Sequence, residues 1–290
     1  YDYPPRDALP KHLRMLFRVF NPVDVTENLS NLYSYSQQST NDFLSIEHTR
    51  LMVRGFEQAG GPYDTYEDPS PLGHYIYHQS ACWRRAFEHL LPRTRNPYPR
   101  EIRYKTYTLR YPGAYWVETT RFREWGAAAT FRATAKGSGR IQLESANATA
   151  IKLSPNPEWA ADDGTFDVTW NGLSFSGRRL DGNGDVTLRR QRRDEEPVHK
   201  STAVCGPASD VFNFPFVAVW GTTGTAADSA RNKRLATTFR RDWYDYAEGD
   251  VPLMRDVDVS DDMIERYGLV LFGSPDTNKL IKRIAPDLPF

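Results

Sequence analysis

Cysteine is scarce in this sequence of 290 residues, in which only Cys82 and Cys205 occur. Two cysteines that lie far apart cannot build a disulfide framework or a cysteine-rich metal cluster. Neither has a histidine and an acid close to it in the sequence, as a cysteine nucleophile would need. We therefore expect two buried thiols, with a disulfide between them as the less favoured alternative.

Long apolar runs and a net charge are also missing. No stretch of about 18 apolar residues occurs, so the sequence predicts no membrane span, and no signal-peptide pattern opens the chain. Lys and Arg together number 37, as do Asp and Glu, so no overall field attracts nucleic acid or an anionic membrane. We expect no nucleic-acid partner, and a secreted or periplasmic location is the expectation for the compartment.

Several motifs that carry chemistry are absent. A G-x-S-x-G nucleophile elbow occurs nowhere, and the nearest string, residues 172–177, has its second glycine one place too late. No H-x-x-x-H pair with a carboxylate predicts zinc. The acidic loop at 181–185 lacks a glutamate at the twelfth loop position, where Arg192 stands. A hairpin turn is therefore favoured there over a calcium site, and we expect neither a metal nor another cofactor.

Strand and helix signals alternate in the first part of the chain, residues 1–99. The predicted elements are strands over 28–37 and 63–67 and helices over 46–59 and 79–91. Gly60 and Gly61 end the first helix, and Pro92 ends the second. This order predicts the edge of a parallel sheet in an α/β domain.

The rest of the chain divides into a β-rich part and a second α/β part. Short alternating strands fill residues 100–193: 102–108, 115–118, 130–134, 140–144, 166–170 and 186–188. Many short strands with glycine-rich turns between them indicate a β-sandwich. The charged segment 189–200 is the predicted linker. In residues 201–290, apolar strands over 216–220 and 269–272 alternate with helices over 226–246, 261–266 and up to Ile284, which predicts a small parallel α/β domain.

One stretch in the first part carries most of the functional signal. Leu44-Ser45-Ile46-Glu47-His48-Thr49-Arg50 follows a turn that bears Asp42, and the next strand leads to Gly73-His74. In this stretch and in residues 99–111, 114–117, 216–225 and 269–278, the chain resembles large bacterial α/β-hydrolases of the prolyl oligopeptidase-like group. The segments also follow one another in the same order as in that group. In that group a hydrolase domain is followed by a β-rich module and a small flavodoxin-like α/β module.

The resemblance implies that the chain is the C-terminal portion of a serine hydrolase, a peptidase or an esterase acting on a peptide or ester substrate. Residues 1–99 are then the C-terminal part of the hydrolase domain, 100–193 a β-sandwich and 201–290 the flavodoxin-like domain. His74 corresponds to the catalytic base. The nucleophilic serine is expected from an upstream segment or from a partner chain, and an oligomer is possible.

The acid of this site stays open between two neighbouring residues. Alignment backward from His48 puts the family's acid on Asn41, with Asp42 one residue later, and Gln37-Gln38 replaces the usual His-Gly. An amide cannot stabilise the imidazolium that a catalytic base becomes. Either Asp42 orients His74 through a shifted turn, or the chain is a degenerate, non-catalytic hydrolase that serves as a structural or binding subunit.

Each candidate residue also has a simpler structural interpretation. His74 could be a surface-turn histidine, and Asp42 a helix cap or a solvated turn acid. His48, His78 and His89 are predicted to be ordinary surface or groove residues. The loop 221–225 follows a strand and opens a helix, as phosphate-binding loops do, but it lacks the lysine and glycine spacing of the known motifs. A structural turn is favoured there.

Overall fold

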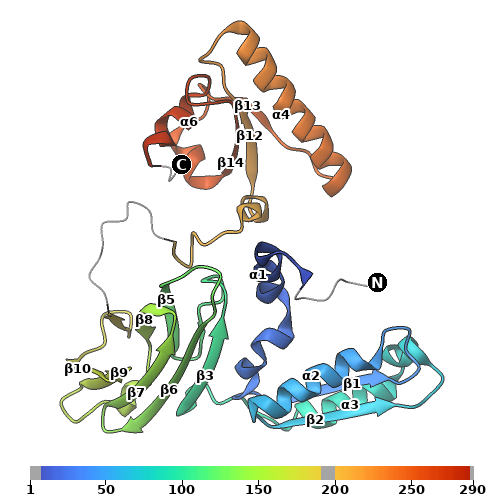
Figure 1. Ribbon diagram of the computed structural model, residues 1–290, viewed down its shortest axis with the longest axis vertical. Coiled ribbons are helices and arrows are strands. Elements are labelled where there is room, and N and C mark those ends of the chain that lie inside the picture. Colours follow the sequence, from blue (N-terminus) through green and yellow to red (C-terminus); the bar gives the residue numbers. More distant parts are fainter. Residues whose placement is uncertain (1–7, 191–199, 288–290) are drawn as a thin grey trace. The chain divides into compact units, whose positions relative to one another are not determined.

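The computed structural model describes residues 8–190 and 200–287, which form a mixture of α-helices and β-sheets (Figure 1). They fall into two compact units, one made of the residues up to Arg190 with Lys200–Cys205, the other starting at Gly206. The first two parts expected from the sequence therefore lie in one unit. Most of the predicted linker, 191–199, lies outside the described residues.

A two-stranded parallel sheet lies at the centre of the first part. It pairs β1 (Ser34–Ser39) with β2 (Tyr63–Asp68), Ser34 opposite Tyr63. Helix α2 (Ile46–Ala59) and helix α3 (Ser80–Leu90) cover opposite faces, because Gln37 bonds to Cys82 of α3 while its neighbour Gln38 bonds to Thr49 of α2. The parallel pairing is the one predicted.

Helix α2 has the bounds that the sequence predicts. The Ser45 hydroxyl accepts a hydrogen bond from the N–H of Glu47 and caps the first turn. Gly60 ends the helix with a φ of 71°, in the left-handed region that glycine adopts without strain. Helix α3 is also close to its prediction, but a 3₁₀ helix, η3 (Gly73–His78), precedes it where the sequence suggested a plain loop.

The N-terminal helix α1 (Lys11–Phe20) and the 3₁₀ segment η2 (Pro22–Leu29) were not predicted, although Lys11–Phe20 has an amphipathic pattern. Segment η2 packs on α2 so closely that a Cβ on Gly55 would lie 2.4 Å from Cγ2 of Thr26. Asn28 exchanges two hydrogen bonds with the backbone of Lys105, at 2.6 and 2.9 Å. This links the first part to the β-rich part.

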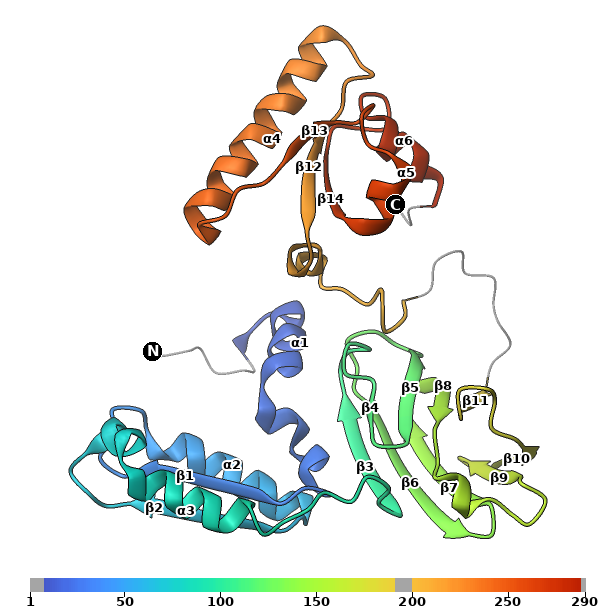
Figure 2. The same cartoon turned by 180° about the vertical axis from the view of Figure 1, so that it is seen from behind.

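The β-rich part contains two sheets around one core. The five-stranded sheet has the order β10 (Leu173–Arg178), β9 (Phe166–Trp170), β7 (Arg140–Ala146), β6 (Ala129–Gly137) and β3 (Glu101–Thr106). The four-stranded sheet has the order β11 (Val186–Arg189), β8 (Ala148–Leu153), β5 (Val117–Phe122) and β4 (Gly113–Ala114) (Figure 2). Side chains of both sheets share one buried cluster that includes Ile102, Phe131, Leu143, Ile151 and Trp170, and the short 3₁₀ turn η4 (Pro157–Trp159) adds Trp159 to it.

Two glycine-rich turns of this part, of which the one at 181–185 was predicted as a hairpin, connect different kinds of neighbours. Gly137–Gly139 does join the antiparallel neighbours β6 and β7. The turn at 181–184 does not make a hairpin, because β10 before it and β11 after it belong to different sheets. The Asp181 carboxylate accepts hydrogen bonds from the N–H groups of Asn183 and Asp185 and so closes the turn on itself.

The second unit is a three-stranded parallel sheet of order β13 (Leu253–Arg255), β12 (Phe216–Trp220) and β14 (Gly268–Phe272). Helix α4 (Ala226–Ala247) lies on one side, and α5 (Asp261–Arg266) and α6 (Lys279–Ile284) lie on the other (Figures 1 and 2). Val217, Val219, Val259 and Leu280 form its core. The 3₁₀ segments η5 (Ala208–Asn213) and η6 (Ala285–Asp287) complete it. The parallel α/β arrangement is the predicted one.

The unit boundary falls after Cys205 rather than at residue 201. Cys205 is buried and packs with Leu109, Phe122 and Ala129, so Lys200–Cys205 belongs to the first unit. Both cysteines are free thiols, and Cys82 is only half-buried. Among the helices of the described ranges, none is both long and apolar enough to cross a membrane.

Candidate functional site

The structure brings His74 and Asp42 together at the carboxyl ends of β1 and β2. Asp42 lies in the turn between β1 and α2, and His74 lies in the first turn of η3, after β2. Nδ1 of His74 is 3.0 Å from Oδ2 and 3.3 Å from Oδ1 of Asp42. Of the two acids left open by the sequence, Asp42 is therefore the one that contacts the imidazole.

Asn41 has a different role, which explains why the contact falls one residue later than the family alignment suggests. Its side-chain amide donates hydrogen bonds to the backbone carbonyls of Pro69 (3.1 Å) and Ser70 (2.9 Å). The N–H of Thr40 donates to the carbonyl of Asp68 at 2.8 Å. These bonds tie the turn after β1 to the turn after β2 and direct Asn41 away from His74.

Gly73 permits the close approach of the two turns. Its φ is +57°, and a Cβ at this position would lie 2.9 Å from the carbonyl oxygen of Asn41. A side chain would clash there and would also be strained by the left-handed backbone. The glycine before His74 is thus required for the imidazole to reach Asp42.

Asp42 is held in place as a charged group. Its side chain is only 1% exposed, and Oδ1 accepts the N–H of Leu44 at 2.9 Å. The hydrogen bond from Leu44 is the largest cause of a lowered Asp42 pKa; burial opposes it, and His74 lowers the pKa further. The carboxylate is therefore ionised at neutral pH.

The imidazole of His74 is 45% exposed and lies among aromatic rings. The ring centroid of His74 is 4.9 Å from that of Phe43, in a tilted contact, and 5.4 Å from that of Tyr77, in an edge-on contact. Burial, and then the nearby Asp42 carboxylate, raise the pKa of Tyr77. Because an ionised carboxylate can only accept, Nδ1 carries the proton in the neutral ring and Nε2 keeps its lone pair. Such a ring can accept a proton from a hydroxyl group.

A nucleophile for this base is not found in the described part of the chain, where no hydroxyl or thiol is hydrogen-bonded to His74. Ser39, near the turn, is engaged with the backbone: its hydroxyl accepts the N–H of Asn41. Asp42 can orient His74, and His74 can act as a base for a nucleophile on another polypeptide segment. The described residues do not form a complete triad.

A second histidine–carboxylate cluster lies at the opposite end of the same strands, where no sequence motif predicts one. Nδ1 of His89 is 3.2 Å from Oδ2 of Asp64, and both contact the hydroxyl of Tyr33, at 2.9 and 2.6 Å. Tyr35 stacks on His89 at 4.7 Å. Burial, and then the Asp64 carboxylate, raise the pKa of Tyr33 to about 12. The cluster joins the last turn of α3 to the sheet.

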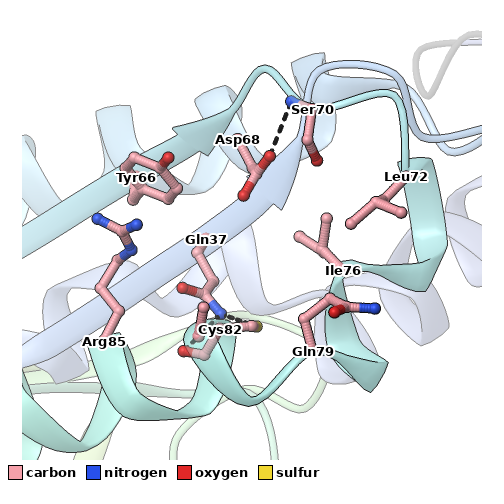
Figure 3. Close-up of a pocket in the computed structure, with 10 residues that line it drawn as sticks. Gln37, Tyr66, Asp68, Ser70, Leu72, Ile76, Gln79, Cys82 and Arg85 are labelled. Atoms are coloured by element: carbon pink, nitrogen blue, oxygen red, sulfur yellow. Dashed lines mark hydrogen bonds between the residues drawn. The ribbon is translucent and has the colours of Figure 1, made fainter.

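A pocket of about 220 Å³ opens between α3, η3 and the two strands (Figure 3). Gln37 donates a hydrogen bond to the carbonyl of Cys82 in its wall, and Arg85 lies over the ring of Tyr66 at 3.6 Å. Burial raises the pKa of the Cys82 thiol, so Cys82 is not activated as a thiolate. His74 does not line this pocket.

The remaining candidates from the sequence have ordinary surroundings. In the loop 221–225, the N–H and hydroxyl of Thr222 both donate to the buried Asp256, and Thr225 forms a capping box with Asp228 at the start of α4. These donors are used inside the unit, as in a structural turn. Within residues 8–190 and 200–287, no three His, Cys, Asp or Glu side chains gather as metal ligands would.

Comparison with known proteins gives no match, whether with family models, with curated proteins or with solved structures.

Proposed function

We propose that this chain is the C-terminal portion of a serine hydrolase of the prolyl oligopeptidase-like kind. In this proposal the part up to residue 99 is the end of an α/β-hydrolase domain, the two packed sheets are a β-sandwich module and the second unit is flavodoxin-like. The alternation of parallel strands and helices at 34–90 and the order of the three parts along the chain support it.

The proposed chemistry follows from the geometry at His74. Nε2 takes the proton of a serine hydroxyl as the serine oxygen attacks the carbonyl carbon of a peptide or ester, and later gives the proton to the leaving group. Asp42 holds the proton on Nδ1 and stabilises the imidazolium. The serine comes from an upstream segment or from a partner chain.

One observation carries the proposal: the Asp42 carboxylate, whose side chain is 1% exposed, is bonded at 3.0 Å to Nδ1 of a histidine whose side chain is 45% exposed. A plain surface histidine does not need a buried carboxylate, nor a glycine in the left-handed region to bring the two together. This combination of burial on one side and exposure on the other is the arrangement of a catalytic base and its orienting acid.

Labelling of the assembled protein with a fluorophosphonate probe tests the proposal, the assembled protein being this chain together with the polypeptide that carries the serine. We expect one labelled serine outside these 290 residues, with labelling lost in His74→Ala and in Asp42→Ala. His89→Ala is the matched control, because it removes the other histidine–carboxylate pair of the same sheet. Labelling that persists in both site variants would overturn the proposal.

A non-catalytic binding subunit is the second candidate function. It is favoured because, among the described residues, no hydroxyl group is hydrogen-bonded to His74, and because apolar side chains of α3 are exposed. In that case the assembled protein shows no labelled serine, and substitution of Asp42 alters stability only.

A further inference from the structure

Helix α3 runs along β2 with one row of its side chains facing one row of the strand. Residues four apart on a helix rise by about 6 Å, and residues two apart on a strand by about 6.6 Å, so two such rows stay in step. The helix row is Ala81, Arg85 and His89, and the strand row is Asp68, Tyr66 and Asp64. His89 bonds to Asp64, and Arg85 lies over Tyr66 at 3.6 Å.

The third position of the two rows is incomplete, because the methyl group of Ala81 is too short to pair with Asp68. Both residues line the pocket of about 220 Å³. In the described ranges Asp68 forms no ion pair, and its Oδ1 accepts the N–H of Ser70 at 2.8 Å. Ser70 is the largest cause of a lowered Asp68 pKa; burial opposes it, and the charge of Arg85 lowers the pKa further. The pocket therefore contains an ionised carboxylate without a contacting cation.

Arg85 is the second unpaired charge of this pocket (Figure 3). Its guanidinium stacks on the ring of Tyr66, and no carboxylate or carbonyl is bonded to it among the residues that the structure describes. Its planar fork of N–H donors fits a carboxylate. Because Tyr66 and Asp68 are two residues apart on one face of β2, the two charges are roughly 7 Å apart. They share the pocket without contacting each other.

A single α-amino acid fits between two opposite charges at this separation. Its ammonium donates to one carboxylate and its own carboxylate accepts from one guanidinium, each at about 2.8 Å. The nitrogen and the carboxyl carbon are joined through Cα by two bonds of about 1.5 Å, so the whole bridge is about 7 Å long. A simple anion would neutralise Arg85 only, and a simple cation would neutralise Asp68 only.

The rest of the pocket selects the size and polarity of the ligand. Leu72 and Ile76 provide an apolar wall at the η3 end. Gln37 is not available to a ligand, since its amide is bonded to Cys82 and to Tyr35. The volume equals about seven water molecules and lies below the roughly 300–1,000 Å³ of pockets for drug-sized ligands. A free amino acid fits this space, whereas a longer peptide does not.

We propose that this pocket binds a free α-amino acid with an apolar side chain. The ammonium group binds Asp68, the carboxylate binds Arg85, and the side chain packs against Leu72 and Ile76. The site is separate from His74, which does not line the pocket, and it requires no hydrolase activity. Refutation of the proposed function would leave it standing.

Isothermal titration calorimetry of the chain with L-leucine tests the proposal. We expect saturable binding with submillimolar affinity, as the small size of the ligand allows. Two analogues each lack one charge: 4-methylpentanoate has no ammonium group, and 3-methylbutylamine has no carboxylate. Each should bind at least about tenfold more weakly than leucine, because each loses a hydrogen bond to a charged group. These comparisons use the unaltered chain, so they do not depend on the folding of a variant.

Substitutions assign the two charges of the ligand to their partners. Asp68→Asn and Arg85→Gln should each weaken leucine binding by at least about tenfold, and Ala81→Leu should abolish it by filling the pocket. The amine analogue should lose affinity in Asp68→Asn but not in Arg85→Gln, and the acid analogue the reverse. Asp64→Asn is the matched control, because Asp64 faces α3 from the same strand but does not line the pocket.

Three results would overturn the proposal. The first is the absence of leucine binding. The second is equal binding of leucine and one of the analogues, which would make this a site for a simple anion or a simple cation. The third is leucine binding that survives Ala81→Leu unchanged, which would place the amino acid elsewhere on the chain.

Discussion

The two parallel sheets of this protein differ in how far each is completed within the chain. In the second unit, β12 reads Phe-Val-Ala-Val-Trp, and its Val217, Ala218 and Val219 are at most 2% exposed. It has a strand on each side and helices on both faces. In the first unit, β1 reads Ser-Tyr-Ser-Gln-Gln-Ser and pairs, within the described residues, with β2 alone.

The two sheets use the carboxylates at their carboxyl edges for different purposes. The second sheet uses them at its carboxyl edge to hold its own loops, as Asp256 does by accepting three hydrogen bonds from Thr222 and Lys279. The first sheet uses Asp42 at the same edge to hold a histidine that is open to solvent. A buried carboxylate is structural in one sheet and, in our proposal, catalytic in the other.

The largest effect should separate these two carboxylates. Asp42→Asn in the assembled protein should lower turnover by about 10⁴-fold, because an amide favours the wrong tautomer of the base. Asp256→Asn should leave turnover per folded molecule unchanged. Steady-state kinetics on a peptide or ester substrate measures both, and equal losses in the two variants would contradict the distinction.

A smaller effect should appear in stability, with the order of the two carboxylates reversed. Asp256→Ala leaves the N–H groups of Thr222 and Lys279 without their buried acceptor, so the free energy of opening β12 should fall by about 3 kcal/mol. Hydrogen exchange of the β12 amides measures it. Asp258→Ala is the control, since its ion pair with Arg255 is exposed and should matter little.

Substitution of Gly73, in the turn before His74, should lower the free energy of unfolding less than Asp256→Ala does. It should lower it more than substitution of a glycine that has empty space around it. Gly73→Ala should cost about 2 kcal/mol through the left-handed backbone and the contact with Asn41, and turnover should fall as His74 shifts. Gly60→Ala has a similar φ, but a Cβ there has nothing within 4 Å, so only the left-handed backbone should contribute a cost, about 1 kcal/mol. Urea unfolding compares the two, and equal costs would show that the close approach is unimportant.

The smallest expected effect is the loss of folding stability at low pH. Since the Asp42 pKa is lowered below its ordinary value of about 3.9, the carboxylate stabilises the fold above that pH. This contribution is lost as the pH falls through the lowered pKa. His74→Ala should raise the Asp42 pKa only part of the way back, because the Leu44 hydrogen bond is the larger cause. Carbon-detected NMR titration of the carboxyl group follows this, and full recovery would assign the shift to His74 instead.

Elements with strong local signals could be predicted from the sequence. Ser45 and Gly60 define α2, and the apolar strands of the second unit stand out from their surroundings. Strands β8 and β10 and the short strands β4 and β13 were missed. In β8, both faces are largely buried, so Ala148–Leu153 does not alternate. In β10, the side chains are mostly exposed, so Leu173–Arg178 gives no clear hydrophobic pattern.

The candidate site could be located only to within one residue. Local sequence does not decide between Asn41 and Asp42, because the choice depends on where the Asn41 amide finds acceptors, and these are carbonyls 28 and 29 residues away. The cluster of Tyr33, Asp64 and His89 was missed for the same reason. Tyr33 precedes β1, Asp64 lies in β2 and His89 lies in α3, and no sequence spacing signals a contact among them.

The paired hydrogen bonds between Asn28 and Lys105 bear on how this protein can be dissected genetically. A truncation after Pro99 would follow the apparent end of the first α/β part, yet it would remove the partners of both Asn28 and Asn31. Segment η2 would then lose its attachment to β3, and α2 would lose the support of η2 at Gly55. A cut between Cys205 and Gly206 instead preserves every one of these contacts, so gene fragments and domain exchanges should be planned around that position.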